Sequence, residues 1–327
     1  MFRRIHLAPV AFAVLTAGGV SLAQTPIQRA VPSTKAPLTP RTAAPIKPIE
    51  MPPAPPSDPK KTVPAPTSTP TPPAPPPAIR SRKVMTVSAK EGSKVHTVAC
   101  EDGRVVTGGF ASTFPGLILA MRPASDGAAF IAQNDAAGAT TTQAICIQRP
   151  GGYTIVKNTR TLAPRDRALV DVTCPANTVV IGGGASTETG VYLSMSAPKL
   201  DGSAWSANYR SDAIIGNKTA ETFAVCAAQD AVRGRVVEAR PQPAVSVRPG
   251  GYSGTLQLVC PAGKRALSIG YSFNATLVKQ PSLHRSEKPF NGVMSETWAG
   301  GFSNVSSFID NVTVTGQLVA ICADTAE

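Results

Sequence analysis

Residues 174–186 read Cys-Pro-Ala-Asn-Thr-Val-Val-Ile-Gly-Gly-Gly-Ala-Ser, and a related run follows two other cysteines. Residues 100–112 read Cys-Glu-Asp-Gly-Arg-Val-Val-Thr-Gly-Gly-Phe-Ala-Ser, and residues 260–272 read Cys-Pro-Ala-Gly-Lys-Arg-Ala-Leu-Ser-Ile-Gly-Tyr-Ser. Each copy has Gly or Asn three positions after the cysteine, an apolar residue at the sixth position and serine at the twelfth. Such self-similarity indicates an internal repeat.

Two further elements accompany every copy, one before it and one after it. The closing elements are Ala144-Ile-Cys146, Ala224-Val-Cys226 and Ala320-Ile-Cys322. The leading elements are apolar stretches at residues 83–87, 153–156 and 235–237. We therefore divide this part of the chain into repeats at residues 83–150, 151–231 and 232–327.

The local patterns predict an all-β fold. Apolar and polar residues alternate before the cysteines, and helical periodicity is absent. Gly or Asn at the third position suits a turn with positive φ, and the glycine pairs let another backbone come close. Two Asp-Gly pairs are typical of hairpin turns, and three aromatic residues are expected in the core. These residues are Asp126-Gly127 and Asp201-Gly202 for the turns, and Phe130, Trp205 and Trp298 for the core.

The six cysteines predict one disulfide in each repeat. Six cysteines allow fifteen pairings, but the repeats select the pairing that joins the first cysteine of each copy to its last. We expect Cys100–Cys146, Cys174–Cys226 and Cys260–Cys322. With all cysteines oxidised, no thiolate remains as a nucleophile.

Three like modules can be arranged in two ways. Closure around a pseudo-threefold axis, as in a β-prism, hides the sheet edges of all three. The alternative is a string of small β-sandwiches. A strand exchanged between neighbouring repeats would favour the closed form, and we expect the first strand of each repeat to be the exchanged one.

The repeats resemble a known kind of module. Cys174-Pro-Ala, the Gly182-Gly183-Gly184 run and the Ala224-Val-Cys226 ending resemble cysteine-pair modules of exported, largely uncharacterised bacterial proteins. More distantly, the three repeats are similar to the vitelline membrane outer layer protein family, which implies a threefold β-prism. The motifs are structural, so the resemblance implies an architecture and hardly any function.

The segments before the repeats indicate export. Residues 1–23 have a basic start, a short apolar run and the small-x-small ending Ser21-Leu22-Ala23, as a signal peptide has. Residues 24–82 are rich in Pro, Ala, Thr and Ser without an aromatic residue, which predicts a disordered, extended tether. We expect a periplasmic, cell-surface or extracellular protein with no transmembrane segment in the mature chain.

The positive charge is concentrated in the tether. The chain carries a formal net charge of +12, to which the nine Lys/Arg and two Asp/Glu of residues 24–83 contribute +7. This distribution does not indicate a basic globular face, so we expect no nucleic-acid partner. The tether either docks a partner or an anionic surface, or serves only as a spacer.

Catalytic and metal-ligating motifs are weak. Outside the signal peptide only His96 and His284 are present, far apart in sequence, and we expect no metal and no cofactor. Gly251-Tyr-Ser-Gly254 is one residue short of a nucleophile elbow. Carboxylates beside turns, at Glu101, Asp102 and Asp166, leave a hydrolase open.

The binding candidates come from a repeated pentapeptide. Arg-Pro-Gly-Gly-Tyr occurs at residues 149–153 and 248–252, and tyrosine beside a glycine-rich turn can stack on a sugar ring. We therefore predict Arg149, Tyr153, Arg248 and Tyr252 as binding residues and no catalytic residue. The expected function is an exported, non-catalytic envelope or surface protein that binds an envelope polymer or glycan. The alternative is an exported hydrolase with a carboxylate site in a groove between modules.

Overall fold

The computed structural model describes residues 79–89, 93–114, 117–135, 139–248, 254, 256–273, 278–290, 293–304 and 312–326. All of them belong to a compact unit, Pro70–Glu327. The predicted signal peptide and most of the predicted tether lie outside the described residues. Within this part of the chain, no helix is long and apolar enough to cross a membrane.

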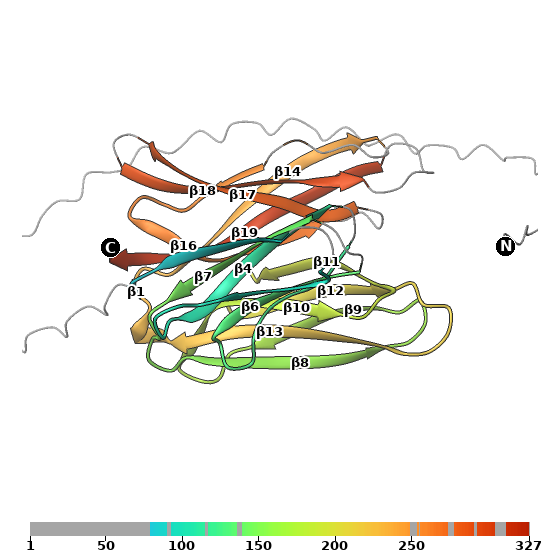
Figure 1. The fold of residues 1–327 in the computed structure, drawn as a ribbon, viewed down its shortest axis with the longest axis horizontal. Helices are drawn as coiled ribbons and strands as arrows, with labels where there is room; N and C mark the ends of the chain where they lie inside the picture. The colour runs from blue at the N-terminus through green and yellow to red at the C-terminus, as the bar shows by residue number, and fades with distance from the viewer. Residues whose placement is uncertain are drawn as a thin grey trace, which may run out of the picture. The chain divides into compact units, whose positions relative to one another are not determined.

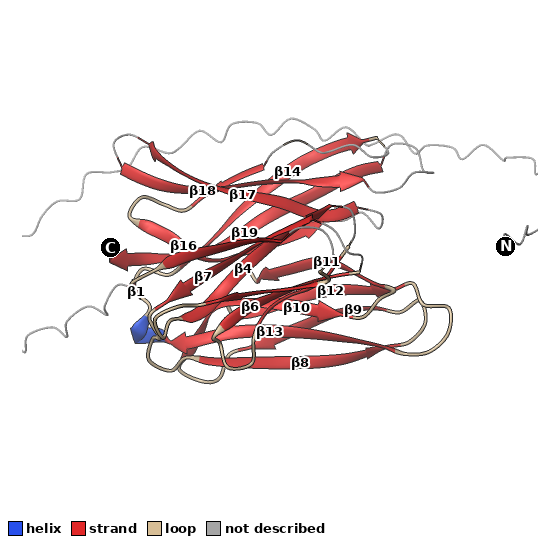
Figure 2. Ribbon diagram, viewed as in Figure 1, coloured by secondary structure: helices blue, strands red, loops and turns tan. Residues whose placement is uncertain are grey.

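Nearly all of the described chain is β-strand, as Figure 2 shows. Repeat 1 contains β2 (Lys83–Ala89), β3 (Val95–Ala99), β4 (Val105–Phe114), β5 (Ile118–Pro123), β6 (Ala129–Asn134) and β7 (Ala139–Ile147). Repeat 2 contains β8 (Thr154–Leu162), β9 (Arg167–Thr173), β10 (Thr178–Thr187), β11 (Val191–Pro198), β12 (Ala204–Ser211) and β13 (Lys218–Ala228). Repeat 3 contains β14 (Val236–Val247), β15 (Leu256–Val259), β16 (Lys264–Phe273), β17 (Val278–Phe290), β18 (Val293–Asn304) and β19 (Val312–Ala326).

A short strand before the repeats also belongs to the fold. Strand β1 (Ile79–Arg80) pairs in parallel with the end of β19, as Figure 1 shows, and Ile79 is buried. The sequence prediction placed residues 79–82 in the disordered tether, and for these residues it is wrong. Their contacts with repeat 3 hold them in the fold although they follow a proline-rich segment. The one helical element among the described residues is a 3₁₀ turn, η1 (Gln229–Ala231).

Each repeat folds into two three-stranded antiparallel sheets. In repeat 1, for example, the last strand, β7, lies between the first, β2, and the third, β4. In the other sheet the fifth strand, β6, lies between the second, β3, and the fourth, β5, and repeats 2 and 3 have the same order. Each disulfide connects these two sheets, because its first cysteine directly follows the second strand and its second lies on the last. The predicted pairing is confirmed, with Cα–Cα distances of 5.7, 5.7 and 5.8 Å for Cys100–Cys146, Cys174–Cys226 and Cys260–Cys322.

Neighbouring repeats share sheets. The fourth strand of repeat 1, β5, pairs with the third strand of repeat 2, β10, and β11 pairs with β16 in the same way. Strand β17 of repeat 3 contacts β4 of repeat 1. This pairing contradicts a string of separate sandwiches. The strand that pairs with the neighbouring repeat is the fourth, so our prediction that the first strand is exchanged is wrong. The first strand pairs instead with the last strand of its own repeat, which carries the second cysteine. The full β-prism geometry stays a prediction.

The third strands of the three repeats, β4, β10 and β16, converge at one point. Each has a register shift between the sixth and the eighth residue after the cysteine, which marks a β-bulge. The eighth residues are Gly108, Gly182 and Ser268. A Cβ added at Gly108 would lie 2.7 Å from the Cβ of Ser268, and one added at Gly182 would overlap the carbonyl of Thr107. Repeat 3 can carry serine here because the other two repeats carry glycine.

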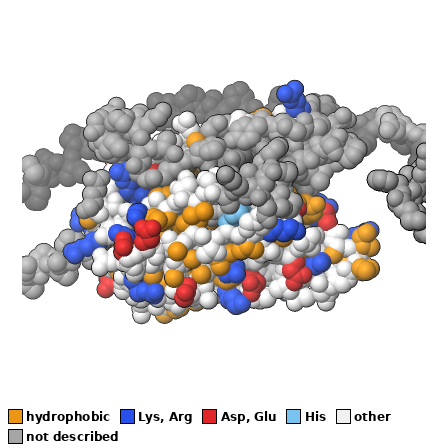
Figure 3. Space-filling view, in the orientation of Figure 1, with side chains coloured by type: hydrophobic (Ala, Val, Ile, Leu, Met, Phe, Trp, Pro, Cys, Tyr) orange, Lys and Arg blue, Asp and Glu red, His pale blue; other side chains and the backbone are white. Residues whose placement is uncertain are grey.

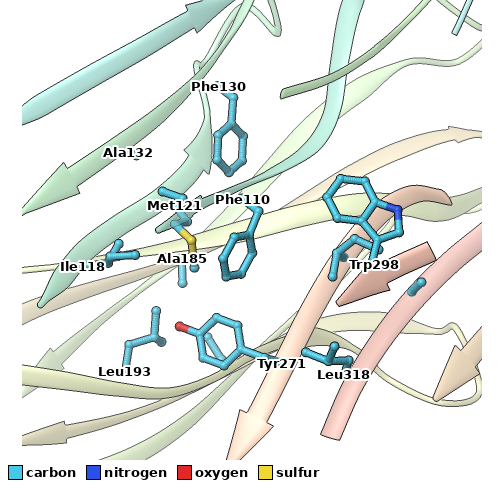
Figure 4. Close-up of a cluster of buried hydrophobic side chains, with 14 of the residues drawn as sticks. Phe110, Ile118, Met121, Phe130, Ala132, Ala185, Leu193, Tyr271, Trp298 and Leu318 are labelled. Atoms are coloured by element: carbon cyan, nitrogen blue, oxygen red, sulfur yellow. The ribbon is translucent and has the colours of Figure 1, made fainter. Parts of the chain in front are cut away.

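One hydrophobic core serves all three repeats. Phe110 and Met121 of repeat 1, Leu193 of repeat 2 and Tyr271 of repeat 3 belong to the same buried cluster (Figure 4). The predicted core positions of Phe130, Trp205 and Trp298 are confirmed, since each is at most 1% exposed. Gly109 and Gly183 lie directly beneath Phe130 and Trp205, where a Cβ would approach the aromatic ring to 2.6 and 2.5 Å. The glycine pairs therefore make room for an aromatic ring and for a backbone.

The glycine contact can be tested with a matched pair of alanine substitutions. In Gly182→Ala the new methyl group would collide with the backbone of β4, and we expect a loss of at least about 3 kcal/mol in the free energy of unfolding. In Gly151→Ala the nearest atom lies 3.9 Å from the new methyl group, so a change within about 0.5 kcal/mol is expected. Denaturant unfolding measures both, and equal effects would contradict the close approach.

The shared sheets predict that a single repeat does not fold alone. A fragment of residues 153–230 keeps Cys174–Cys226 but loses β5 and β16, which pair with β10 and β11 from the neighbouring repeats. We expect no cooperative thermal transition for the oxidised fragment, while residues 79–327 melt cooperatively. A cooperative melt of the fragment as a monomer, checked by size-exclusion chromatography, would show that the repeats are independent.

Candidate functional site

The first predicted binding motif is engaged inside the fold. Tyr153 is half-buried, and its hydroxyl donates a hydrogen bond of 2.7 Å to the backbone oxygen of Val106. The Arg149 guanidinium lies 4.8 Å from the centroid of the Tyr153 ring, and the hairpin glycine Gly127 packs against the hydroxyl end of the ring. Burial raises the pKa of Tyr153. These contacts give Tyr153 a structural role, and binding by Arg149 and Tyr153 stays a prediction.

Tyr153 is one of three equivalent side chains that connect successive repeats. The residues just before the first strands are Arg82, Tyr153 and Arg235. Tyr153 of repeat 2 bonds to Val106 of repeat 1, Arg235 of repeat 3 bonds to Val180 of repeat 2, and Arg82 bonds to Ala266 of repeat 3. All three acceptors are the sixth residue after the cysteine, where the bulge interrupts the ladder. We call these three side chains the latches.

The latch formed by Arg82 carries a buried ion pair. Its Nη2 donates to both carboxylate oxygens of Glu296 at 2.7 Å, and the two side chains are 7% and 0% exposed. The same carboxylate accepts the backbone N–H of Ala266 at 3.1 Å. In repeats 1 and 2 the Asp-Gly hairpin turn faces the latch. The β17–β18 hairpin of repeat 3 extends beyond this point and presents Glu296 instead.

The second predicted motif occupies a different structural position. Arg149 and Tyr153 precede the first strand of repeat 2, whereas Arg248 follows the first strand of repeat 3 and is exposed. Tyr252 lies outside the described residues. The two copies of Arg-Pro-Gly-Gly-Tyr are therefore not equivalent in the fold, and a binding role for Arg248 and Tyr252 stays a prediction.

The residues considered for metal binding or hydrolysis have structural surroundings where they are described. His96 is 5% exposed, and its Nε2 lies 3.1 Å from the Ser93 carbonyl oxygen. His284 lies in strand β17, opposite Ala299 of β18. Glu101 pairs with Lys83, and Asp102 pairs with Arg104. The described ranges contain no cluster of three or more metal-ligating side chains.

One of the two accessible aromatic groups lies on a sheet face that sequence patterns did not reveal. Among aromatic residues whose exposure the structure describes, only Tyr153 and Tyr192 are not buried. Tyr192 of β11 is directly opposite Arg210 of β12, which is directly opposite Arg167 of β9. Directly opposed residues have Cβ atoms about 4.5–5.5 Å apart. We call this cross-strand set the Tyr192 row.

The Tyr192 row faces solvent because its strand neighbours face the core. Leu193 and Tyr209, adjacent to Tyr192 and Arg210 along their strands, are at most 5% exposed. The Tyr192 hydroxyl makes no hydrogen bond within the described part of the chain. Arg210 Nε forms a 2.9 Å ion pair with Asp212 Oδ1, whereas Arg167 forms none with a described residue. Two guanidinium groups side by side favour an anionic ligand.

Several loops of repeat 2 end beside this row. The Ser211 N–H donates to the Asp166 carbonyl oxygen at 2.8 Å, and the Asp212 N–H donates to the Gly190 carbonyl oxygen at 2.9 Å. These bonds hold the β8–β9, β10–β11 and β12–β13 loops together at one end of the sheet. No single stretch of sequence indicates this cluster, because its residues come from three separate strands and loops.

Sequence comparison leaves this site without a known counterpart. No protein-family model matches the chain. No curated protein matches it in sequence. The resemblance to exported cysteine-pair modules and to the vitelline membrane outer layer family therefore stays a prediction.

The Arg82–Glu296 pair predicts a large stability effect at the junction between tether and repeats. Arg82→Met would remove the guanidinium from the buried Glu296 carboxylate, and breaking a buried ion pair in this way typically costs about 3–5 kcal/mol in the free energy of unfolding. The double variant Arg82→Met/Glu296→Gln should recover much of that loss. Lys157→Met, which breaks the exposed pair with Glu221, should cost no more than about 1 kcal/mol. If Arg82→Met and Lys157→Met behave alike in denaturant unfolding, the latch is not a structural requirement.

Proposed function

We propose that the protein is an exported, non-catalytic envelope or surface protein that binds an acidic glycan through the Tyr192 row. The observation that carries the proposal is the free, half-buried Tyr192 ring in register with two guanidinium groups on a solvent-facing sheet. An aromatic ring offers an apolar face for a sugar ring. The guanidinium groups of Arg167 and Arg210 can hold a carboxylate or phosphate in a bidentate manner.

Three disulfides support an oxidising compartment, in agreement with the signal-like residues 1–23. The rigid sheet also suits binding without a conformational change. The backbone of Arg210 is fixed by ladder pairs on both sides and that of Tyr192 by its pair with Arg210, and Asn208 adds an exposed amide in the next row. A pre-organised flat face of this kind needs little ordering when an extended polymer binds. The proline-rich tether would let the face reach polymer at a distance.

Binding to soluble polysaccharides tests the proposal. Isothermal titration or affinity electrophoresis with uronic-acid-containing and neutral polysaccharides should show binding to the acidic ones. Tyr192→Ala and Arg167→Gln should each weaken it about tenfold, which corresponds to about 1.4 kcal/mol. Arg233→Gln, at a half-exposed arginine of repeat 3, serves as the control and should leave it unchanged.

Two results would count against the proposal. Equal affinity of Tyr192→Ala and the unchanged protein would place the ligand elsewhere, with Arg248 and Tyr252 as the next residues to substitute. Release of reducing ends from a polysaccharide would instead support the hydrolase predicted as the alternative from the sequence.

A further inference from the structure

The β12–β13 loop exposes two adjacent isoleucines. Ile214 is 78% exposed and Ile215 is 84% exposed, more than any other large apolar residue for which exposure is described. Apolar side chains of this size are usually buried, and two in sequence at a loop tip are unusual for a surface that meets only water. They are followed by Gly216, which has a φ of 74°. A Cβ added at Gly216 would meet no atom within 4 Å. The loop therefore projects from the fold.

The base of this loop is held firmly although its tip is open. Ser211 and Asp212 are bonded to the backbone of the two neighbouring loops, as described above. Lys218 begins β13 directly after the tip and pairs with Leu162 of β8. The isoleucines therefore project from a fixed base at the end of repeat 2. Figure 3 shows apolar and cationic side chains together on one face of the described surface.

Cationic side chains lie on the strands and the loop that adjoin the base of this loop. Arg165 is exposed on the adjacent β8–β9 loop, Arg167 begins β9, and Arg160 is exposed on β8 opposite Ala220 of β13. None of these three forms an ion pair with a described residue. Of the acidic neighbours, Asp212 pairs with Arg210 and Glu188 lies 3.9 Å from Lys218. The Asp166 carboxylate accepts only the backbone N–H of Arg167, so it keeps its charge and offsets one of the three arginines. The free charge around the tip is positive.

We propose that the β12–β13 loop inserts Ile214 and Ile215 into the outer layer of an anionic phospholipid bilayer. In this arrangement the free guanidinium groups contact lipid phosphates, and the Tyr192 ring lies at the level of the headgroups. Apolar tips flanked by Lys or Arg, with an aromatic residue at the interface, match the layered polarity of a bilayer surface. This inference goes beyond the glycan proposal because it rests on the apolar tip, although Arg167 and Tyr192 belong to both surfaces.

A bilayer fits this tip better than a protein partner. Stable protein interfaces bury about 800 Å² on each partner and need a broad complementary surface. Two side chains on a projecting loop offer much less area, but a fluid bilayer closes around them. Insertion of so small a tip gives only weak binding, and stable attachment takes a second signal. The part of the tether before the fold, with an excess of four positive charges in residues 24–78, can supply it.

Vesicle flotation of residues 24–327 tests the proposal. Vesicles of equal phosphatidylglycerol and phosphatidylcholine should bind the protein, and pure phosphatidylcholine vesicles should bind it weakly. Ile214→Ser/Ile215→Ser should lower binding to the anionic vesicles about tenfold. Leu200→Ser removes a similarly exposed apolar residue, 62% exposed on the β11–β12 hairpin, and should leave binding unchanged.

Because the basic tether can bind anionic vesicles by itself, a second measurement must report on the tip. Ile215→Trp places a fluorophore there, whereas Trp205 and Trp298 are buried. Its emission should shift to the blue on addition of the anionic vesicles and should be quenched by brominated lipid.

Three outcomes would overturn the proposal. One is an unshifted and unquenched emission of Ile215→Trp on vesicles that retain the protein. Another is equal flotation of Ile214→Ser/Ile215→Ser and Leu200→Ser. The third is a dimer in analytical ultracentrifugation that disappears in Ile214→Ser/Ile215→Ser, which would make a second copy the occupant. Soluble acidic polysaccharide, tested with Tyr192→Ala, reports on the glycan proposal separately.

Discussion

The contact between the third strands of the three repeats is the constraint on which the fold depends. At Gly108, Gly182 and Ser268 the backbones approach so closely that a larger side chain at either glycine would meet a neighbouring strand. A bulge just before this position in each strand adjusts its path. This convergence brings Phe110, Met121, Leu193 and Tyr271 into one cluster, so that three small modules share a single core. Small units gain stability in this way because each alone would bury too little apolar surface.

The latches follow from the same geometry. A bulge interrupts strand pairing, and a buried backbone carbonyl beside it needs another donor. For repeats 1 and 2 the donor is the residue just before the first strand of the next repeat, Tyr153 or Arg235. For repeat 3 the donor is Arg82, which lies just before the first strand of repeat 1. Residues 79–82 are therefore part of the folded unit, and the proline-rich segment is joined to the fold at the place where first and last repeats meet.

The candidate site lies where the repeats differ from one another. The shared positions, such as the cysteines, the bulges and the aromatic core residues, are all used for structure. The Tyr192 row and the Ile214–Ile215 tip belong to repeat 2 and have no counterpart in the shared pattern. Their closeness at one end of repeat 2 places the two surfaces that we propose for glycan and for lipid beside each other.

Short-range patterns in the sequence determined the all-β class, the three disulfides, the Asp-Gly turns and the core positions of Phe130, Trp205 and Trp298. These features depend on residues close in the chain or on a repeat that can be aligned. The exchange of the fourth strand, the role of Tyr153 as a latch, the burial of Glu296 against Arg82 and the Tyr192 row were decided only by the tertiary structure. Each of them depends on which strands become neighbours, and strand pairing between distant segments is set by the shared core and not by any local pattern.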